Sequence, residues 1–320
     1  MKAIRIHELG APEVMRYEET ADLRPGPGQI LVKVAAAGVN PVEAYIRSGS
    51  YTRTPVLPYT PGSDAAGSVE ALGSEVTSFN IGNRIYTSGS LSGTYAEFAL
   101  CNESQIHPLP DNVSFQQGAA LGIPYGTAYR ALFQKASAKA DETVLIHGAS
   151  GGVGIACIQL ARAAGLTVIA TGGSDTGREL IKEQGADHVL DHTSQGYLDM
   201  IRSITSGHGV DVILEMRAEA NLAGDLLVMA RNGRVIVIGS RGNAEINPRE
   251  LMAKDAAVYG MVLFNTPESE FKCIHSALKA GLSLGALKPV IGKEVPLRDA
   301  SKAHHMIMEE RAYGKVVLTV

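Results

Sequence analysis

Cysteine is scarce in this chain, and the few cysteines lie far apart. The 320 residues include only Cys101, Cys157 and Cys273. Such a set cannot supply the four thiolates of a structural zinc site, and a small odd number fits a reducing compartment better than a disulfide framework. We predict that Cys157 is a small core residue of a helix.

An excess of basic residues and a long apolar run are also missing. The formal net charge is -4, which argues against a nucleic-acid-binding protein, because phosphate contacts require a basic surface. No run of about 18 apolar residues predicts a transmembrane helix. The first residues alternate like a strand and lack the apolar block of a signal peptide. We therefore expect a cytosolic (cytoplasmic) protein that contacts neither membranes nor nucleic acid.

The length and composition are those of a globular protein with a large core. With 320 residues, 45% hydrophobic and 19% charged, the chain is long enough for two domains. Up to about residue 120 it contains strand-like runs at residues 30–37, 65–72 and 84–87, separated by glycine, proline and serine. Many short strands with such breaks favour a barrel-like β domain.

From residue 142 onward, strand-like and helix-like segments alternate. Strands are predicted at residues 144–147, 168–171, 188–190, 210–215 and 234–238. This alternation is typical of a doubly wound parallel sheet. It stops after about residue 262. A helix-like segment at 268–280 and a last strand at 315–320 remain, and such a tail could return to complete the first domain.

The most informative segment joins the first of these parallel strands to the next helix. It reads His147-Gly-Ala-Ser-Gly-Gly-Val-Gly154 and is followed by a helix-compatible segment at residues 155–164. This is the AxGxxG form of a dinucleotide-binding turn, although a purely structural glycine turn is an alternative. Side chains at Gly151 and Gly152 would keep a pyrophosphate away, and Gly154 allows the helix to pack closely on the strand. The helix N-terminus then offers N–H groups and its positive dipole end to the phosphates.

Together with this turn, further motifs match one family over nearly the whole chain. They are Gly38-Val-Asn-Pro-Val-Glu43, Tyr45-Ile-Arg-Ser-Gly49, Leu57-Pro-Tyr-Thr-Pro-Gly-Ser-Asp64, Gly122-Ile-Pro-Tyr125, Thr127-Ala-Tyr-Arg130, Gly233-Arg-Val-Ile-Val-Ile-Gly-Ser-Arg-Gly242 and Leu287-Lys-Pro-Val-Ile-Gly292. The chain resembles the zinc-free, zeta-crystallin-like quinone oxidoreductases of the medium-chain dehydrogenase/reductase superfamily. The resemblance implies an α/β fold with a GroES-like, β-rich catalytic domain (residues 1–122 and 263–320) and a Rossmann domain with a doubly wound parallel sheet (residues 123–262). It also implies an active site in the cleft between the two domains.

The residues at the metal position of zinc-dependent relatives are poor zinc ligands. Those relatives place a cysteine after the early strand and a histidine–glutamate pair further on, where this chain has Asn40 and then Ser63-Asp64. An amide, a hydroxyl and one carboxylate do not make a tetrahedral zinc site. The adjacent His304 and His305 would point in different directions on a helix. We expect no catalytic metal.

The residues after the second parallel strand favour NADPH over NADH. Enzymes that use NAD usually carry an acidic residue about 20 positions after the glycine turn. Here the strand tip ends in Ser174, and Asp175, the main contrary sign, comes one residue later. Arg178 and Lys182 lie one turn apart on the following helix and could surround a 2′-phosphate together with His192. Solvated helix charges are the alternative for both.

The resemblance also implies which residues line the cofactor. They are Tyr45, Ser150, Gly151, Gly152, Val153, Gly173, His192, Asn221, Ile238, Gly239, Ser240, Arg241, Met261, Val262 and Leu263. The segment 238–241 ends a predicted parallel strand, where open sheets bind ligands. An N-cap role is an alternative for Asn221, which opens a helix-like segment.

The polar residues of the early loops are the candidate catalytic groups, namely Asn40, Tyr45, Tyr51 and Tyr59. The nicotinamide supplies the electrons, so the protein mainly has to hold a quinone against the ring and exclude water. Tyrosine can stack on a flat acceptor and donate a hydrogen bond to its oxygen, and Asn40 could polarise a carbonyl in place of zinc. No residue stands out as an obligatory proton donor, and one-electron and two-electron reduction both stay open.

These inferences predict an NADPH-dependent quinone oxidoreductase that transfers electrons or hydride without a metal. An enone or alkenal reductase is an alternative, because fold does not fix substrate. A cofactor-binding protein with a structural or RNA-binding role is another, although the acidic charge argues against RNA. We also expect a homodimer or homotetramer, in which an exposed strand of the Rossmann sheet could pair across a two-fold axis.

Overall fold

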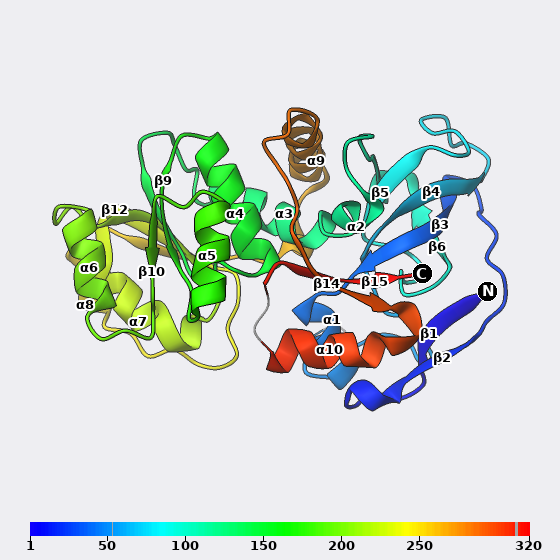
Figure 1. The fold of residues 1–320 in the computed structure, drawn as a ribbon, viewed down its shortest axis with the longest axis horizontal. Coiled ribbons are helices and arrows are strands. Elements are labelled where there is room, and N and C mark those ends of the chain that lie inside the picture. Colours follow the sequence, from blue (N-terminus) through cyan, green and yellow to red (C-terminus); the bar gives the residue numbers. More distant parts are fainter. Residues whose placement is uncertain (53, 311–312) are drawn as a thin grey trace. The chain divides into compact units, whose positions relative to one another are not determined.

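The chain forms two compact units, drawn in Figure 1. The computed structural model describes residues 1–52, 54–310 and 313–320. The first unit consists of Met1–Ile123 and Lys279–Val320, and the second of Pro124–Leu278. The chain therefore leaves the first unit, forms the second and returns with its C-terminal segment.

A seven-stranded sheet of mixed direction organises the first unit. Its order is β14-β15-β3-β4-β5-β7, and β6 also pairs with β3. The strands are β3 (Gln29–Gly38), β4 (Asp64–Leu72), β5 (Arg84–Ser88), β6 (Phe98–Asn102), β7 (Ile106–Pro108), β14 (Ile291–Pro296) and β15 (Lys315–Thr319). Strands β1 (Lys2–Ile6) and β2 (Met15–Glu19) form a separate antiparallel pair. The three early strands and the last strand expected from the sequence are confirmed.

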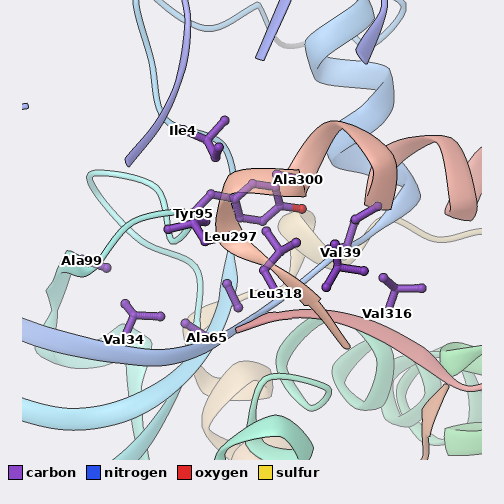
Figure 2. Packing of buried hydrophobic residues seen from close by; sticks show 13 residues of the cluster. Ile4, Val34, Val39, Ala65, Tyr95, Ala99, Leu297, Ala300, Val316 and Leu318 are labelled. Carbon is purple, nitrogen blue, oxygen red and sulfur yellow. The ribbon is translucent and has the colours of Figure 1, made fainter. Parts of the chain in front are cut away.

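The core of the first unit combines both ends of the chain. Figure 2 shows Tyr95 among apolar side chains that include Val39, Leu297, Ala300 and Leu318. Helices α1 (Pro41–Ser48) and α10 (Ala300–Glu309) contact each other beside this core. The smaller helical elements are η1 (Pro12–Val14), η2 (Glu103–Gln105), α2 (Phe115–Gly118) and η5 (Leu297–Asp299).

Six parallel strands form the sheet of the second unit, in the order β10-β9-β8-β11-β12-β13. They are β8 (Thr143–Ile146), β9 (Thr167–Thr171), β10 (His188–Leu190), β11 (Val210–Glu215), β12 (Met229–Val237) and β13 (Ala257–Gly260). The order reverses between β8 and β11, which is the doubly wound arrangement. The predicted α/β fold is therefore confirmed. The sequence prediction placed the first five of these strands and missed β13.

Helices cover both faces of this parallel sheet. Helix α4 (Gly152–Ala163) packs on β8 and β9, and α5 (Asp175–Glu183) packs on β9 and β10. On the other face, Leu145, Ile169 and Ile213 share a hydrophobic cluster with residues of α6 (Tyr197–Ile204) and α7 (Ala218–Val228). The remaining elements are α3 (Gly122–Tyr129), the π-helical turn η3 (Arg130–Lys135), α8 (Pro248–Met252), η4 (Leu263–Asn265) and α9 (Glu268–Ser283).

The second boundary between the units lies within helix α9, after Leu278. From the sequence we predict this boundary after residue 262. In the structure, the Arg130 guanidinium pairs with Glu270 at 2.9 Å and donates to the carbonyl of Asn265. The first part of α9 is thereby fixed to η3 in the second unit. The first division follows Ile123, one residue after the expected boundary.

Across the described residues, none of the helices combines the length and the apolar character needed to cross a membrane.

Candidate active site

The residues proposed to line a cofactor, apart from Tyr45, gather at one edge of the parallel sheet. Each group follows the carboxyl end of a strand or its connection: 150–153 follow β8, Gly173 follows β9, His192 follows β10, 238–241 follow β12 and 261–263 follow β13. Asn221 lies in α7, directly after β11. Since all six strands are parallel, these segments share the carboxyl edge, where open α/β sheets bind ligands.

The glycine turn after β8 has the geometry of a phosphate-binding loop. Gly151 is the N-cap of α4, and no side chain caps this helix. The first N–H groups of α4 are therefore available for an anion. A Cβ atom on Gly154 would lie 2.5 Å from the Cα of Ala149, whereas the nearest atom to a Cβ on Gly151 is 3.7 Å away. Gly154 is thus required for packing, and Gly151 is not.

Near the end of β9, the positive charge of Arg178 is already paired with acidic side chains. Arg178 pairs with Asp175 at 2.5 Å and with Asp191 at 2.9 Å, and it donates to the carbonyl of Gly172. Lys182, its expected companion, is exposed on the same helix. The guanidinium is thus already held by two carboxylates. A Cβ on Gly173 would lie 2.9 Å from the His192 ring, so these two predicted cofactor residues are neighbours.

The edge between β11 and β12 is tied together through Glu215. Its side-chain Oε1 accepts hydrogen bonds from the backbone N–H of Arg217 and, at 3.1 Å, from the side chain of Asn221. Its backbone carbonyl accepts from Ile238 at 2.8 Å and from Gly239 at 3.2 Å. An N-cap role for Asn221 does not apply, because the N-cap of α7 is Arg217. Glu215 was not among the candidates from the sequence.

A second polar cluster is buried in the first unit, around Asn40. The Asn40 side-chain nitrogen donates to Asp64 at 3.0 Å and to Glu43 at 3.3 Å, and its oxygen accepts from the Lys315 ammonium. Strand pairing brings these residues together, because Gly38, two residues before Asn40, is opposite both Asp64 in β4 and Val317 in β15. Asn40 therefore has no free donor with which to polarise a substrate carbonyl.

The cluster continues through Glu43 to α10. The Tyr95 hydroxyl donates to Glu43 at 2.8 Å, and Tyr95 and His304 Nε2 lie 3.3 Å apart. Arg47 Nε donates to His304 Nδ1 at 3.2 Å. His304 Nδ1 is thus an acceptor, so the ring carries its proton on Nε2 and donates it to Tyr95.

Burial dominates the electrostatics of this cluster. It raises the pKa of Glu43 to about 7, against the opposing charge of Lys315, and it raises the pKa of Asp64. Burial likewise lowers the pKa of Lys315, and it lowers the pKa of His304 to about 3, with Arg47 acting in the same direction. The histidine is therefore neutral, and the Lys315 ammonium faces the carboxyl groups of Asp64 and Glu43.

These residues do not fit a zinc ion at the metal position of zinc-dependent relatives. Asp64 is the one good ligand there, and it lies 3.6 Å from the Lys315 ammonium, while Asn40 is fully hydrogen-bonded. A cation already occupies the place where a metal would need negative donors. Among the described residues, the one group of side chains close enough to share a metal is His147, Glu215 and Asp225, in the other unit.

The three candidate tyrosines also lie in the first unit. Tyr45 is half-buried on α1, and Tyr51 follows that helix. The Tyr59 backbone pairs with Ile6. Its hydroxyl is buried and, among the described residues, has no hydrogen-bond partner. Burial raises the pKa of Tyr59 to about 12, so this group is a neutral O–H donor at physiological pH.

Two families have profiles that match the chain. The alcohol dehydrogenase GroES-like domain matches residues 26–111, and the zinc-binding dehydrogenase family matches residues 152–280. The first match lies in the β-rich unit, and the second lies almost wholly in the unit with the parallel sheet. The predicted GroES-like and Rossmann parts are thereby confirmed.

Named relatives match over the full length. The quinone oxidoreductase of Homo sapiens is 48% identical over 320 residues, which cover 99% of this chain and 97% of that protein. The quinone oxidoreductase of Rattus norvegicus is 49% identical with the same coverage. Among solved structures, Escherichia coli quinone oxidoreductase complexed with NADPH has a TM-score of 0.90 at 28% identity, covering 100% of both chains. A mycobacterial protein complexed with NADPH has a TM-score of 0.91 at 31% identity, again over 100% of both.

The identity to these relatives over almost the entire length, with a GroES-like and a Rossmann part in the expected order, settles the membership. The chain is an oxidoreductase and belongs to the quinone oxidoreductase family of the medium-chain dehydrogenase/reductase superfamily.

Proposed function

We propose that this enzyme oxidises NADPH and passes its electrons to quinones. The observation that carries the proposal is the carboxyl edge of the parallel sheet, where an uncapped glycine turn and the segments after five strands come together. The names of the full-length relatives support the quinone as acceptor, and the NADPH complexes of the structural neighbours support the cofactor.

The residues at this edge fit the parts of NADPH. The N–H groups at the start of α4 suit the pyrophosphate. Arg178, in the first turns of α5, is proposed for the 2′-phosphate, since a guanidinium binds phosphate through paired hydrogen bonds. It would exchange its contact with the exposed Asp175 for the phosphate. Asn221 and the segment 238–241, tied together by Glu215, would hold the nicotinamide end. When bound, NADPH supplies the electrons for the reaction.

The first unit contributes the groups proposed for the acceptor. Tyr45, Tyr51 and Tyr59 are aromatic rings with hydroxyl groups, which suit a flat molecule that carries carbonyl oxygens. Of the three, we propose the Tyr59 hydroxyl as the donor, because its proton has no acceptor among the described residues. For Asn40 we propose a positioning role, since its amide joins Lys315, Asp64 and Glu43.

Steady-state kinetics with a panel of acceptors test the proposal. We expect NADPH oxidation with ortho- and para-quinones, and a kcat/KM for NADPH at least about tenfold above that for NADH. Equal kcat/KM values for NADPH and NADH would contradict the cofactor assignment. Faster turnover of enones or alkenals than of any quinone would contradict the substrate class and favour the reductase alternative.

We also propose a homodimer or homotetramer in the cytosol. The support is strand β13, which ends the sheet order and carries the half-exposed Tyr259, so its outer edge is available for pairing. Sedimentation equilibrium tests this assembly, and a monomer at micromolar concentration would contradict it.

A further inference from the structure

A buried titratable cluster lies at the same edge of the parallel sheet, and the proposed reaction gives its protons no role. It consists of His147, Glu215 and Asp225, whose side chains are 3%, 0% and 0% exposed. Side chains two positions apart along a strand lie on the same face of a sheet. His147, Thr171 and Glu215 come two positions after Leu145, Ile169 and Ile213, respectively, so they lie on the face that carries this hydrophobic cluster. Asp225 comes from α7, which covers that face.

With the usual protonation states, two ionised carboxylates and a protonated histidine, this cluster lacks one proton. His147 Nε2 lies 2.8 Å from Asp225 Oδ1 and 3.6 Å from Glu215 Oε2. The other Asp225 oxygen, Oδ2, and Glu215 Oε2 are buried without a hydrogen-bond partner among the described residues. Two carboxylates and one imidazolium would leave a net negative charge in the interior, which costs several kcal/mol. One added proton removes this charge and lets one carboxyl donate to the other.

The surrounding groups support a proton on Glu215. His147, directly after β8, and Asp225 of α7 face it. Tyr197 of α6 lies close to both carboxyls, and the Thr171 hydroxyl of β9 lies 3.3 Å from His147 Nδ1. Burial and the charge of Asp225 raise the pKa of Glu215 to about 7, although His147 opposes them. Burial lowers the pKa of His147, but the hydrogen bond to Asp225 outweighs it, and the net shift is upward.

A metal ion fits this cluster less well than a proton. Two ligands of a tetrahedral zinc ion lie about 3.3 Å apart, given metal–ligand distances of about 2.0–2.1 Å. His147 Nε2 and Asp225 Oδ1 are closer than that, at the distance of a charge-assisted hydrogen bond.

We propose that Glu215 is a positioning residue that works in its protonated form: one oxygen shares a proton with Asp225, and the other holds Asn221 against the cofactor. When this proton is lost at alkaline pH, the two buried carboxylates repel each other. The hydrogen bonds that Glu215 accepts from Asn221 and from the backbone of Arg217 are then disturbed, and NADPH binds more weakly. The inference rests on the proposed function, because it takes Asn221 as a cofactor contact.

The test is the dissociation constant of NADPH at pH 7 and pH 9, from quenching or enhancement of nicotinamide fluorescence. The 2′-phosphate is ionised across this range. If one proton is required, the wild-type Kd rises about tenfold or more between these values. In Glu215→Gln the amide donates to Asp225 permanently and its oxygen still accepts from Asn221, so the Kd should change less than twofold. Glu183→Gln, an exposed carboxyl of α5, should behave as wild type.

Infrared spectroscopy of the wild-type protein and of Glu215→Gln gives a readout that does not need the cofactor. At pH 7 the wild-type protein should show more protonated buried carboxyl than Glu215→Gln, and this difference should decrease by pH 9. Glu43, whose pKa is also raised to about 7, contributes equally to both spectra. A wild-type Kd that does not change with pH, or an equal rise in Glu215→Gln, would overturn the inference, as would one tightly bound metal per chain that is lost in Asp225→Asn. Failure to bind NADPH at any pH would instead overturn the proposed function, while the infrared difference would still report on Glu215.

Discussion

At the scale of single residues, Lys315 determines the chemistry of the β-rich unit. Its ammonium lies among Asn40, Asp64 and Glu43, where zinc-dependent relatives hold a metal. It faces the carboxyl groups of Asp64 and Glu43 in the interior of the unit, where all three side chains are buried. A buried ion pair adds little stability over an apolar core, but removing one partner leaves an uncompensated charge.

We therefore predict that Lys315→Met destabilises the protein by about 3–5 kcal/mol, measured by urea denaturation. Lys293→Met is the matched control, because the Lys293 side chain is 55% exposed and its ion pair with Glu310 is at the surface; it should cost less than about 1 kcal/mol. The double variant Lys315→Met/Asp64→Asn should recover part of the loss, since it removes the unpaired carboxylate. Equal effects of the two lysine variants would contradict this account of the cluster.

A comparison of Tyr95 with Tyr59 distinguishes a structural role from a role toward the substrate. Tyr95 bonds to Glu43 and His304, so Tyr95→Phe should cost about 1–3 kcal/mol of stability. The Tyr59 hydroxyl has no such partner, so Tyr59→Phe should leave the free energy of unfolding within about 0.5 kcal/mol of wild type and lower kcat/KM for quinones. Denaturation curves and steady-state kinetics of both variants check this. Unchanged kinetics in Tyr59→Phe would remove its hydroxyl from the reaction.

At the scale of elements, the glycine turn between β8 and α4 serves packing and binding through different residues. Gly154→Ala should destabilise the second unit by about 1–3 kcal/mol, because its Cβ would meet the backbone of Ala149. Gly151→Val should fold, because the turn leaves room for a Cβ, but it should raise the NADPH dissociation constant at least about tenfold by filling the phosphate site. Thermal denaturation and fluorescence titration check the pair. Wild-type affinity in Gly151→Val would contradict the phosphate site.

Local patterns in the sequence predict much of the parallel-sheet unit. Strands β8 to β12 are short apolar runs, and the turn after β8 has a glycine spacing with a direct physical meaning. Strand β13 was not predicted, because it is only four residues long and two of them, an alanine and a glycine, are poor strand formers. Helix α1 carried a signal that was not used: Asn40, Pro41 and Glu43 form a capping box with proline at the first helical position.

The two buried clusters could not be predicted, because strand register and not sequence distance creates them. Lys315 meets Asn40 only because β15 returns to pair with β3. His147, Glu215 and Asp225 meet only because β8 and β11 are neighbours in the sheet. Each residue alone reads as an ordinary polar residue, and no periodicity in the chain connects them.

At the scale of the whole molecule, the described part of each unit contains one buried glutamate, Glu43 or Glu215, whose pKa is raised to about 7. The folded state then keeps a proton that the unfolded state loses above its pKa near 4.5. Between these two values stability falls as pH rises. His304 acts in the opposite sense at lower pH, between about 3 and 6.5, because its folded pKa is depressed.

We therefore predict that the free energy of unfolding decreases from pH 6 to pH 8, by about 1 kcal/mol for each of the two glutamates. The double variant Glu43→Gln/Glu215→Gln should show a flatter profile over this range. Urea denaturation at several pH values measures both. A wild-type stability that increases from pH 6 to pH 8 would show that these carboxyl groups are ionised in the folded protein at pH 6.

The most direct test of the central claim is NADPH oxidation by protein that has been treated with a strong chelator and assayed for residual metal. A simple ortho-quinone serves as the acceptor. We predict full turnover with less than about 0.1 zinc per chain, because Lys315 and Asn40 leave the metal position without suitable ligands. Loss of turnover on chelation, with recovery when zinc is added back, would contradict a metal-free quinone reductase.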